Sequence, residues 1–283
     1  MKWIIFVCLF GLAMSKPTYE PINLYYHETI GIPKATAIKR SEESSDFSGN
    51  RIIGGSAAEL MHDPWFGGLI ITLRSGLISV CGSSLLSNTR VITAAHCWFD
   101  GRNVADNVLV VLSSLRLFTG GIRIPTSHAE IYPGYNPLNL NNNIAVLTIP
   151  YIAYTMHIRS IPLPSGPELN NHFNGAVATI PGYGRQTDLA GISMDQRLHR
   201  VELNVISNDV CQTFFSPSIV VASTLCTQNI GRGICDGDSG GPLVTRNMLI
   251  GVASFIPAAG CERNLPVGFS RVTSFAAWIN SRL

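Results

Sequence analysis

The chain has 283 residues, of which 46% are hydrophobic and 13% are charged, and its formal net charge is +2. So high an apolar fraction excludes an intrinsically disordered chain. Basic and acidic residues are well mixed, and there is no basic run with interleaved aromatic side chains. The composition therefore gives no support to nucleic-acid binding.

The amino-terminal end is typical of a secretory signal. Lys2 gives a positive start, an apolar run extends from Trp3 to Leu12, and Ala13-Met14-Ser15 offers small residues for cleavage. The run is shorter than the ~20 residues that span a bilayer, and no later segment is long and apolar enough to do so. We expect residues 1–15 to be a signal peptide. The product is then soluble and extracellular, with the gut lumen as one such destination and no membrane partner.

Residues 16–51 differ in character from the rest of the chain. They contain Pro17, Pro21 and Pro33, a polar tract at 41–46, and no cysteine, which excludes a disulfide-knotted regulatory module. Roughly 230 residues follow, enough to bury a sizeable core.

From position 52 onward, short β-rich runs alternate with clusters of Gly, Pro, Asn and Ser. The clearest runs are at 68–73, 90–93, 108–112 and 249–253. Many short strands at this spacing predict an all-β sandwich or barrel. Near the end, Phe275, Trp278 and Ile279 fall at i, i+3 and i+4, which predicts a short C-terminal amphipathic helix.

Seven cysteines are present, and Cys8 lies in the signal segment. An even number in an exported chain indicates disulfides, and spacing alone leaves 15 pairings open. There is no Cys-x-x-Cys pair and no histidine clusters with the cysteines in the sequence, so no metal or cofactor is expected. The remaining six are Cys81, Cys97, Cys211, Cys226, Cys235 and Cys261.

Two motifs carry chemistry: Thr93-Ala94-Ala95-His96-Cys97 and Gly237-Asp238-Ser239-Gly240-Gly241-Pro242. A serine hydroxyl is a weak nucleophile that needs a positioned base, and the glycines let the backbone approach a substrate closely. Together the motifs resemble the chymotrypsin family of secreted serine proteases over essentially all of 52–283. The closest likeness is to insect digestive chymotrypsins.

That resemblance implies an all-β fold of two six-stranded antiparallel β-barrels, with the catalytic groups in the cleft between them. It implies that His96 is the general base toward the nucleophile Ser239, with the amides of Gly237 and Ser239 forming the oxyanion hole. The other histidines, His27 among them, have no such context and are expected to be solvated or structural. The implied disulfides are Cys81–Cys97, Cys211–Cys226 and Cys235–Cys261.

Asn143 stands where that family has the aspartate of its triad. The aspartate accepts the histidine Nδ1–H and stabilises the imidazolium. A neutral amide can instead donate to Nδ1, which favours the proton on Nε2, and that nitrogen then cannot accept from Ser239. Residues 131–155 contain no Asp or Glu, so we expect no substitute carboxylate. The alternative is that asparagine at this position is a variant of an otherwise complete triad.

Arg51 precedes Ile52-Ile53-Gly54-Gly55, which resembles the activation site of a trypsin-family zymogen. The resemblance implies that cleavage after Arg51 frees the amine of Ile52 to pair with Asp238 and order the oxyanion site. The chain then divides into a propeptide, 16–51, and a chymotrypsin-like peptidase domain, 52–283.

The specificity pocket implied by the resemblance is apolar and narrow. Gly233 forms its floor and supplies no counter-charge for Lys or Arg, while Ser254, Phe255 and Ile256 form a wall. Ile256 replaces a glycine that relatives have there, so its branched side chain should project into the pocket, and Gly268 keeps the opposite wall open. Asp236 adds negative charge at the rim. The loop that holds calcium in some relatives lacks ligands here, since no Asp or Glu lies between Asp106 and Glu130.

Two functions fit these residues. The first is a secreted protease homologue, made as a zymogen, that binds peptides, proteins or inhibitors in the cleft and has lost most catalysis. The second is a low-efficiency digestive endopeptidase with chymotrypsin- or elastase-like specificity, most active at alkaline pH. Both require a trypsin-like activating protease.

Overall fold

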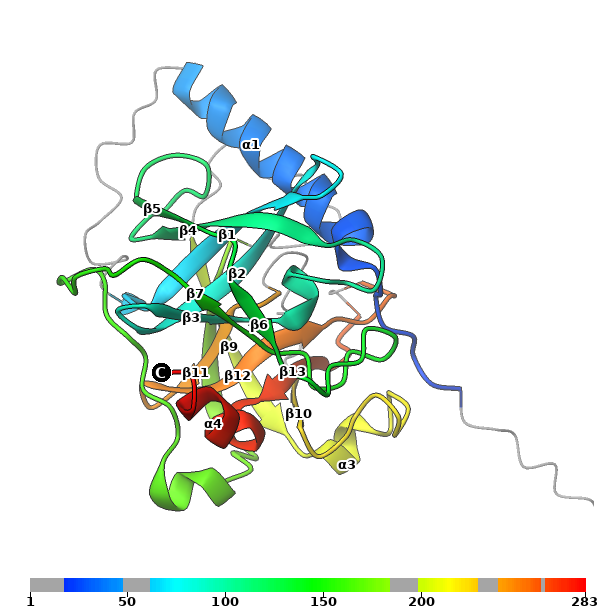
Figure 1. Cartoon of the computed structure of the whole chain (residues 1–283). Coiled ribbons are helices and arrows are strands. Elements are labelled where there is room, and N and C mark those ends of the chain that lie inside the picture. Colours follow the sequence, from blue (N-terminus) through cyan, green and yellow to red (C-terminus); the bar gives the residue numbers. More distant parts are fainter. Residues whose placement is uncertain (1–17, 48–61, 184–197, 229–238, 261–262) are drawn as a thin grey trace, which may run out of the picture.

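A computed structural model describes residues 18–47, 62–183, 198–228, 239–260 and 263–283. Two antiparallel sheets form its body (Figure 1). The first has seven strands in the order β5-β4-β1-β2-β3-β7-β6. They are β1 (Phe66–Leu73), β2 (Ile78–Ser87), β3 (Arg90–Thr93), β4 (Ala105–Leu112), β5 (Ile122–Thr126), β6 (Ala129–Ile131) and β7 (Ala145–Thr148).

The second sheet closes on itself as a barrel in the order β10-β13-β12-β11-β8-β9. Its strands are β8 (Val177–Gly182), β9 (His199–Ile206), β10 (Thr224–Gln228), β11 (Pro242–Thr245), β12 (Met248–Phe255) and β13 (Val267–Arg271). The predicted all-β, chymotrypsin-like architecture is confirmed. The first unit differs from the expected six-stranded barrel, since it pairs as a seven-stranded half-barrel among the described residues.

The four strand runs predicted from the sequence are all strands. They bury aliphatic side chains in the cores of the two sheets, such as Leu69 and Ile71 of β1 and Ile250 of β12. The C-terminal helix is also confirmed as α4 (Val272–Asn280), whose Val272, Phe275 and Ile279 are buried. Short helical turns complete the fold: η2 (Ala95–Cys97), η3 (Gly166–Asn170) and α3 (Asn208–Cys211).

Two elements that lie before position 52 have no clear pattern in the sequence. They are a π-helical turn, η1 (His27–Gly31), and the long helix α1 (Ile32–Phe47), which packs against β2 at one end of the molecule (Figure 1). Ala35 and Ile38 of α1 are buried. The buried face of the helix also includes the polar Lys34, Ser41 and Glu42, so no continuous apolar stripe marks the helix.

Within the described part of the chain, no helix is both long enough and apolar enough to cross a membrane.

Candidate active site

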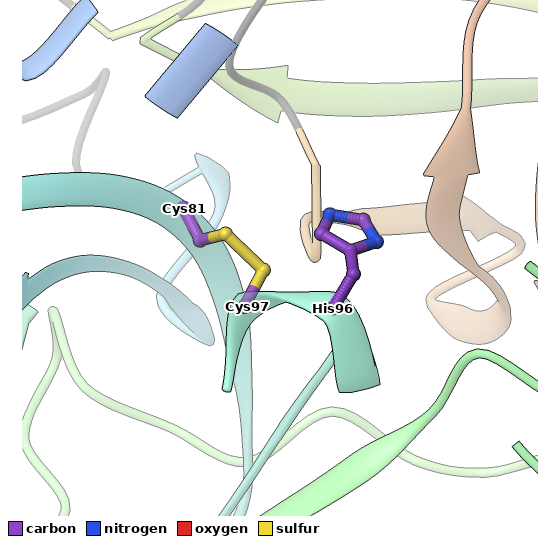
Figure 2. Close-up of side chains that lie close together, drawn as sticks. All are labelled: Cys81, His96 and Cys97. Carbon is purple, nitrogen blue, oxygen red and sulfur yellow. A yellow bond between two sulfur atoms is a disulfide. The ribbon is translucent and has the colours of Figure 1, made fainter. Parts of the chain in front are cut away.

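His96 lies on η2, directly after β3, and is almost completely buried. Ala94 and Ala95 before it are also buried, since only small side chains fit this tight turn. The disulfide between Cys81 of β2 and Cys97 fixes the turn against the first sheet (Figure 2). The two sulfur atoms lie near the imidazole, but because they are bonded to each other they are not free thiolates for a metal.

Asn143 lies just before β7, and the pairing of β3 with β7 brings it to His96. Thr93 is opposite Ala145 in this antiparallel ladder, so the short segment that follows β3 and the short segment that precedes β7 lie side by side. The fully buried Asn143 side chain accepts the backbone N–H of His96 at Oδ1 (2.9 Å). Its Nδ2 lies 2.7 Å from His96 Nδ1 and 2.9 Å from Ser254 Oγ.

These contacts fix the orientation of the amide. The backbone N–H of His96 can only donate, so the atom facing it must be Oδ1, and Nδ2 must face the imidazole. Nδ2 carries two hydrogens, one for Ser254 Oγ and one for Nδ1 of His96. Nδ1 is therefore an acceptor, and the neutral imidazole carries its proton on Nε2.

Ser239 lies across the cleft from His96, at the start of the turn into β11. Its carbonyl accepts the N–H of Gly82 at 2.7 Å. Gly240 has φ of 82°, and a Cβ there would overlap Thr93 Oγ1, so a glycine is required. His96 Nε2 has no hydrogen-bond partner among the described residues. Gly237 and Asp238 lie outside those residues, as do Arg51 and Ile52.

Two residues that were not predicted from the sequence, His27 and Asp100, affect the pKa of His96. Burial, followed by the proximity of His27, lowers the pKa of His96 to about 3, while Asp100 acts in the opposite direction. Asp100 is a buried carboxylate that accepts the backbone N–H groups of His27, Arg102 and Asn103. No substitute carboxylate was expected from the sequence because residues 131–155 contain no Asp or Glu, and Asp100 lies outside that range. Asp100 follows His96 by only four residues, and this short spacing could have indicated a carboxylate near the imidazole.

The described wall of the predicted pocket is formed by the end of β12. Ser254, Phe255 and Ile256 line a small cavity together with His96 and Ser239. Ile256 is half-buried and contacts the hydrophobic cores of both sheets. Gly268 lies opposite Phe255 in the β12–β13 ladder, where a side chain would overlap the Phe255 ring. Its role in the pocket stays a prediction, because Gly233 and Asp236 lie outside the described residues.

Two of the three implied disulfides are present, Cys81–Cys97 and Cys211–Cys226. The second ties α3 to β10 in the closed barrel. The third pair, Cys235 and Cys261, lies outside the described residues.

A histidine and a serine that line one cavity between a half-barrel and a closed barrel are typical of the architecture of a serine protease. The family model described as Trypsin matches residues 52–279. The chain belongs to the trypsin family, whose members share this chymotrypsin-like fold.

Individual relatives agree with that assignment. The "Collagenase" of Hypoderma lineatum is 41% identical over 233 residues, which cover 81% of this chain and 86% of the relative. The solved HL collagenase structure superposes with a TM-score of 0.73 at 39% identity, covering 82% of this chain and 98% of that one. A scabies mite inactivated protease paralogue, S-I1, superposes with a TM-score of 0.68 at 26% identity, covering 78% of this chain and 96% of that one.

Proposed function

We propose that this chain is a secreted serine protease homologue, made as a zymogen, whose peptide-bond hydrolysis is strongly attenuated by Asn143. In this proposal His96 and Ser239 are the base and the nucleophile, and Gly237 and Ser239 supply the oxyanion-binding amides. Peptide or protein substrates, or inhibitors, bind in the cleft between the barrels. A trypsin-like protease cuts after Arg51, and the new Ile52 amine pairs with Asp238.

The observation that carries the proposal is the set of bonds made by Asn143. An amide that donates to Nδ1 holds the histidine in the tautomer that cannot accept the proton of Ser239. It also supplies no negative charge to the imidazolium that forms during attack. In serine proteases of this fold, replacing the aspartate by asparagine preserves the geometry and lowers kcat by roughly 10⁴, or about 5.5 kcal/mol of barrier.

The similarity to solved structures is compatible with either an active or an inactive protein. One relative is named a collagenase and another is titled an inactivated protease paralogue. Asp100 favours a second candidate, a low-efficiency digestive endopeptidase with chymotrypsin- or elastase-like specificity at alkaline pH. Its carboxylate is close enough to raise the pKa of His96 and so offers part of the missing charge.

An active-site titrant distinguishes the two. The protein is cleaved after Arg51, freed of the 16–51 fragment and mixed with a chromogenic ester that acylates serine. The rapid release of one equivalent of chromophore is followed at neutral and alkaline pH. Attenuation predicts no burst at neutral pH and a stoichiometric burst from the Asn143→Asp variant. A full burst from the unaltered protein at neutral pH would contradict the proposal. A burst only above neutral pH would favour the second candidate.

A further inference from the structure

The cleft that holds the catalytic residues is already occupied by residues of this chain. Residues 19–31, here called the strap, enter beside the second barrel and pass directly over His96. The cavity between Tyr26 of the strap, His96 and Ser239 has a volume of about 10 Å³, room for one water molecule at most. No peptide can reach His96 while the strap is in place.

At the second barrel the strap behaves as an added β-strand. Ile22 pairs antiparallel with Pro257. The N–H of Asn23 donates to the carbonyl of Ile256 (3.2 Å), and the N–H of Ala258 donates to the carbonyl of Pro21 (2.8 Å). Main-chain pairing of this kind is how an extended peptide binds a sheet edge, with side chains adding specificity. Here the half-buried Ile22 and Leu24 of the strap pack against the hydrophobic cluster around Phe255 and Phe215.

Past this strand the strap turns onto the catalytic histidine. The ring of Tyr26 lies over the imidazole of His96, with 4.6 Å between centroids, and its hydroxyl donates to the carbonyl of Val80 at 2.7 Å. The next residue, His27, is also buried. Its backbone N–H donates to the carboxylate of Asp100 (2.9 Å), and its Nδ1 is hydrogen-bonded to Ser79 Oγ (2.8 Å). The strap therefore contacts both sheets, and its Tyr26 covers His96.

The strap follows a substrate-like path only as far as Tyr25. This residue has φ of 55°, and the chain then coils into η1 instead of continuing extended past Ser239. A protease acts on an extended peptide held in a near-attack geometry, which a helical turn does not offer. The strap thus has the contacts of an inhibitor rather than of a substrate.

Helix α1 anchors the strap on the first sheet. Its buried Glu42 accepts the backbone N–H groups of Leu117 (2.7 Å) and Phe118 (3.0 Å) and the hydroxyl of Thr119 (3.0 Å). Ala35 and Ile38 pack into a hydrophobic cluster with residues of β1, β2 and β4. A buried carboxylate with several donors and a small apolar face holds this helix without any covalent link, since residues 16–51 contain no cysteine.

We propose that residues 19–31, anchored by α1, are a built-in inhibitor of the cleft, and that cutting the chain after Arg51 does not by itself clear it. The strap must also dissociate or be displaced. This inference concerns the regulation of the site described under the proposed function and requires only that the cleft bind peptides. The experiment below measures no turnover, so its failure and the failure of the attenuation proposal are separate results.

Hydrogen exchange of the full chain, measured before and after cleavage at Arg51, tests the inference. Protection at Ala258 should persist after cleavage, and its loss on cleavage alone would overturn the claim that the strap stays in place. The amide of Ala258 is protected by Pro21 of the strap, whereas the amide of Ala253 donates to Gly241 within the barrel. Three proteins are compared: the unaltered chain, the pair Ile22→Asp and Leu24→Asp, and a control, Tyr19→Asp, at an exposed position.

The paired substitution should speed exchange at Ala258 at least about tenfold, because two apolar contacts are replaced by charges. The control should match the unaltered chain, and Ala253 should stay protected in all three. Tyr26→Leu, which lacks the hydroxyl on Val80, provides a second test with the same expected increase at Ala258. Equal exchange at Ala258 in the unaltered chain and in both altered straps would overturn the inference.

Discussion

Asn143 holds His96 by both ends of one amide: Oδ1 accepts the backbone N–H, and Nδ2 lies 2.7 Å from Nδ1 of the ring. The prediction is that His96 is neutral at pH 7 with its proton on Nε2. Nitrogen-15 NMR of the imidazole reports this directly, since protonated and unprotonated ring nitrogens have well-separated shifts. The Asn143→Asp variant should move the proton to Nδ1 and raise the pKa of the ring. A proton on Nδ1 in the unaltered protein would show that the amide is oriented the other way.

Ile256 should limit the size of side chain that the pocket accepts. In the Asn143→Asp background, where turnover is measurable, Ile256→Gly is expected to raise kcat/KM for Phe substrates more than for Ala or Val substrates. Forcing a ring against a branched side chain costs about 1–3 kcal/mol, so the preference should change roughly 5- to 150-fold. If the unmodified pocket already prefers Phe or Tyr, the side chain of Ile256 points elsewhere.

The strap should bind less tightly in acid. Burial lowers the pKa of His27 to about 4 in the occupied cleft, despite the opposing effect of Asp100, whereas a released histidine titrates near 6.5. Protonation therefore favours the released strap, and affinity present above pH 6.5 is lost as the pH falls toward about 4. His96, whose pKa is also lowered, acts in the same direction.

The measurement is the affinity of the cleaved 16–51 fragment for the protease domain at pH 7.5 and pH 5.5. Titration of His27 alone predicts that the affinity is about tenfold lower at pH 5.5 than at pH 7.5. His27→Gln should remove that part of the pH dependence, and His128→Gln, at an exposed position, should leave it unchanged. An affinity that is equal at the two pH values would show that His27 titrates alike in the bound and released strap.

Activation should begin at one peptide bond. Trypsin treatment of the full chain is expected to give a product whose amino-terminal sequence starts at Ile52, because Arg51 precedes Ile-Ile-Gly-Gly. The bonds after Lys39 and Arg40 should be cut more slowly, since they lie within the docked helix α1. A different first product would contradict the activation step, and equal rates at Arg40 and Arg51 would contradict docking of the helix.

The parts of the fold predicted correctly are those with simple apolar patterns. β3 matches its predicted range, 90–93, because two buried aliphatic residues are bounded by turns. β2 gave no clear signal, because the buried Ser79, Ser83 and Ser84 interrupt its apolar residues. Helix α1 was missed for a related reason: its buried face includes the polar Lys34, Ser41 and Glu42. The groups that bond the Glu42 carboxylate lie far along the chain, at 117–119.

The site was predicted in part. The resemblance to the chymotrypsin family implied that His96, Asn143 and Ser239 share one cleft, and strand register explains why the first two meet. The contacts of Tyr26 with His96 and of His27 with Asp100 form only because the strap folds back over the cleft. Such long-range packing has no signature in local sequence, which is why the segment before Arg51 read only as a propeptide.

The most direct test of attenuation by Asn143 is the ratio of kcat/KM between the Asn143→Asp variant and the unaltered protein. Both are cleaved after Arg51, freed of the 16–51 fragment and assayed on one peptide substrate. The account predicts that the variant is about 10³- to 10⁴-fold faster at neutral pH. The difference in kcat/KM between the two proteins should narrow as the pH rises, because hydroxide takes over part of the role of the base. Equal rates at neutral pH would contradict the account and would mean that another carboxylate, with Asp100 the nearest described one, completes the triad.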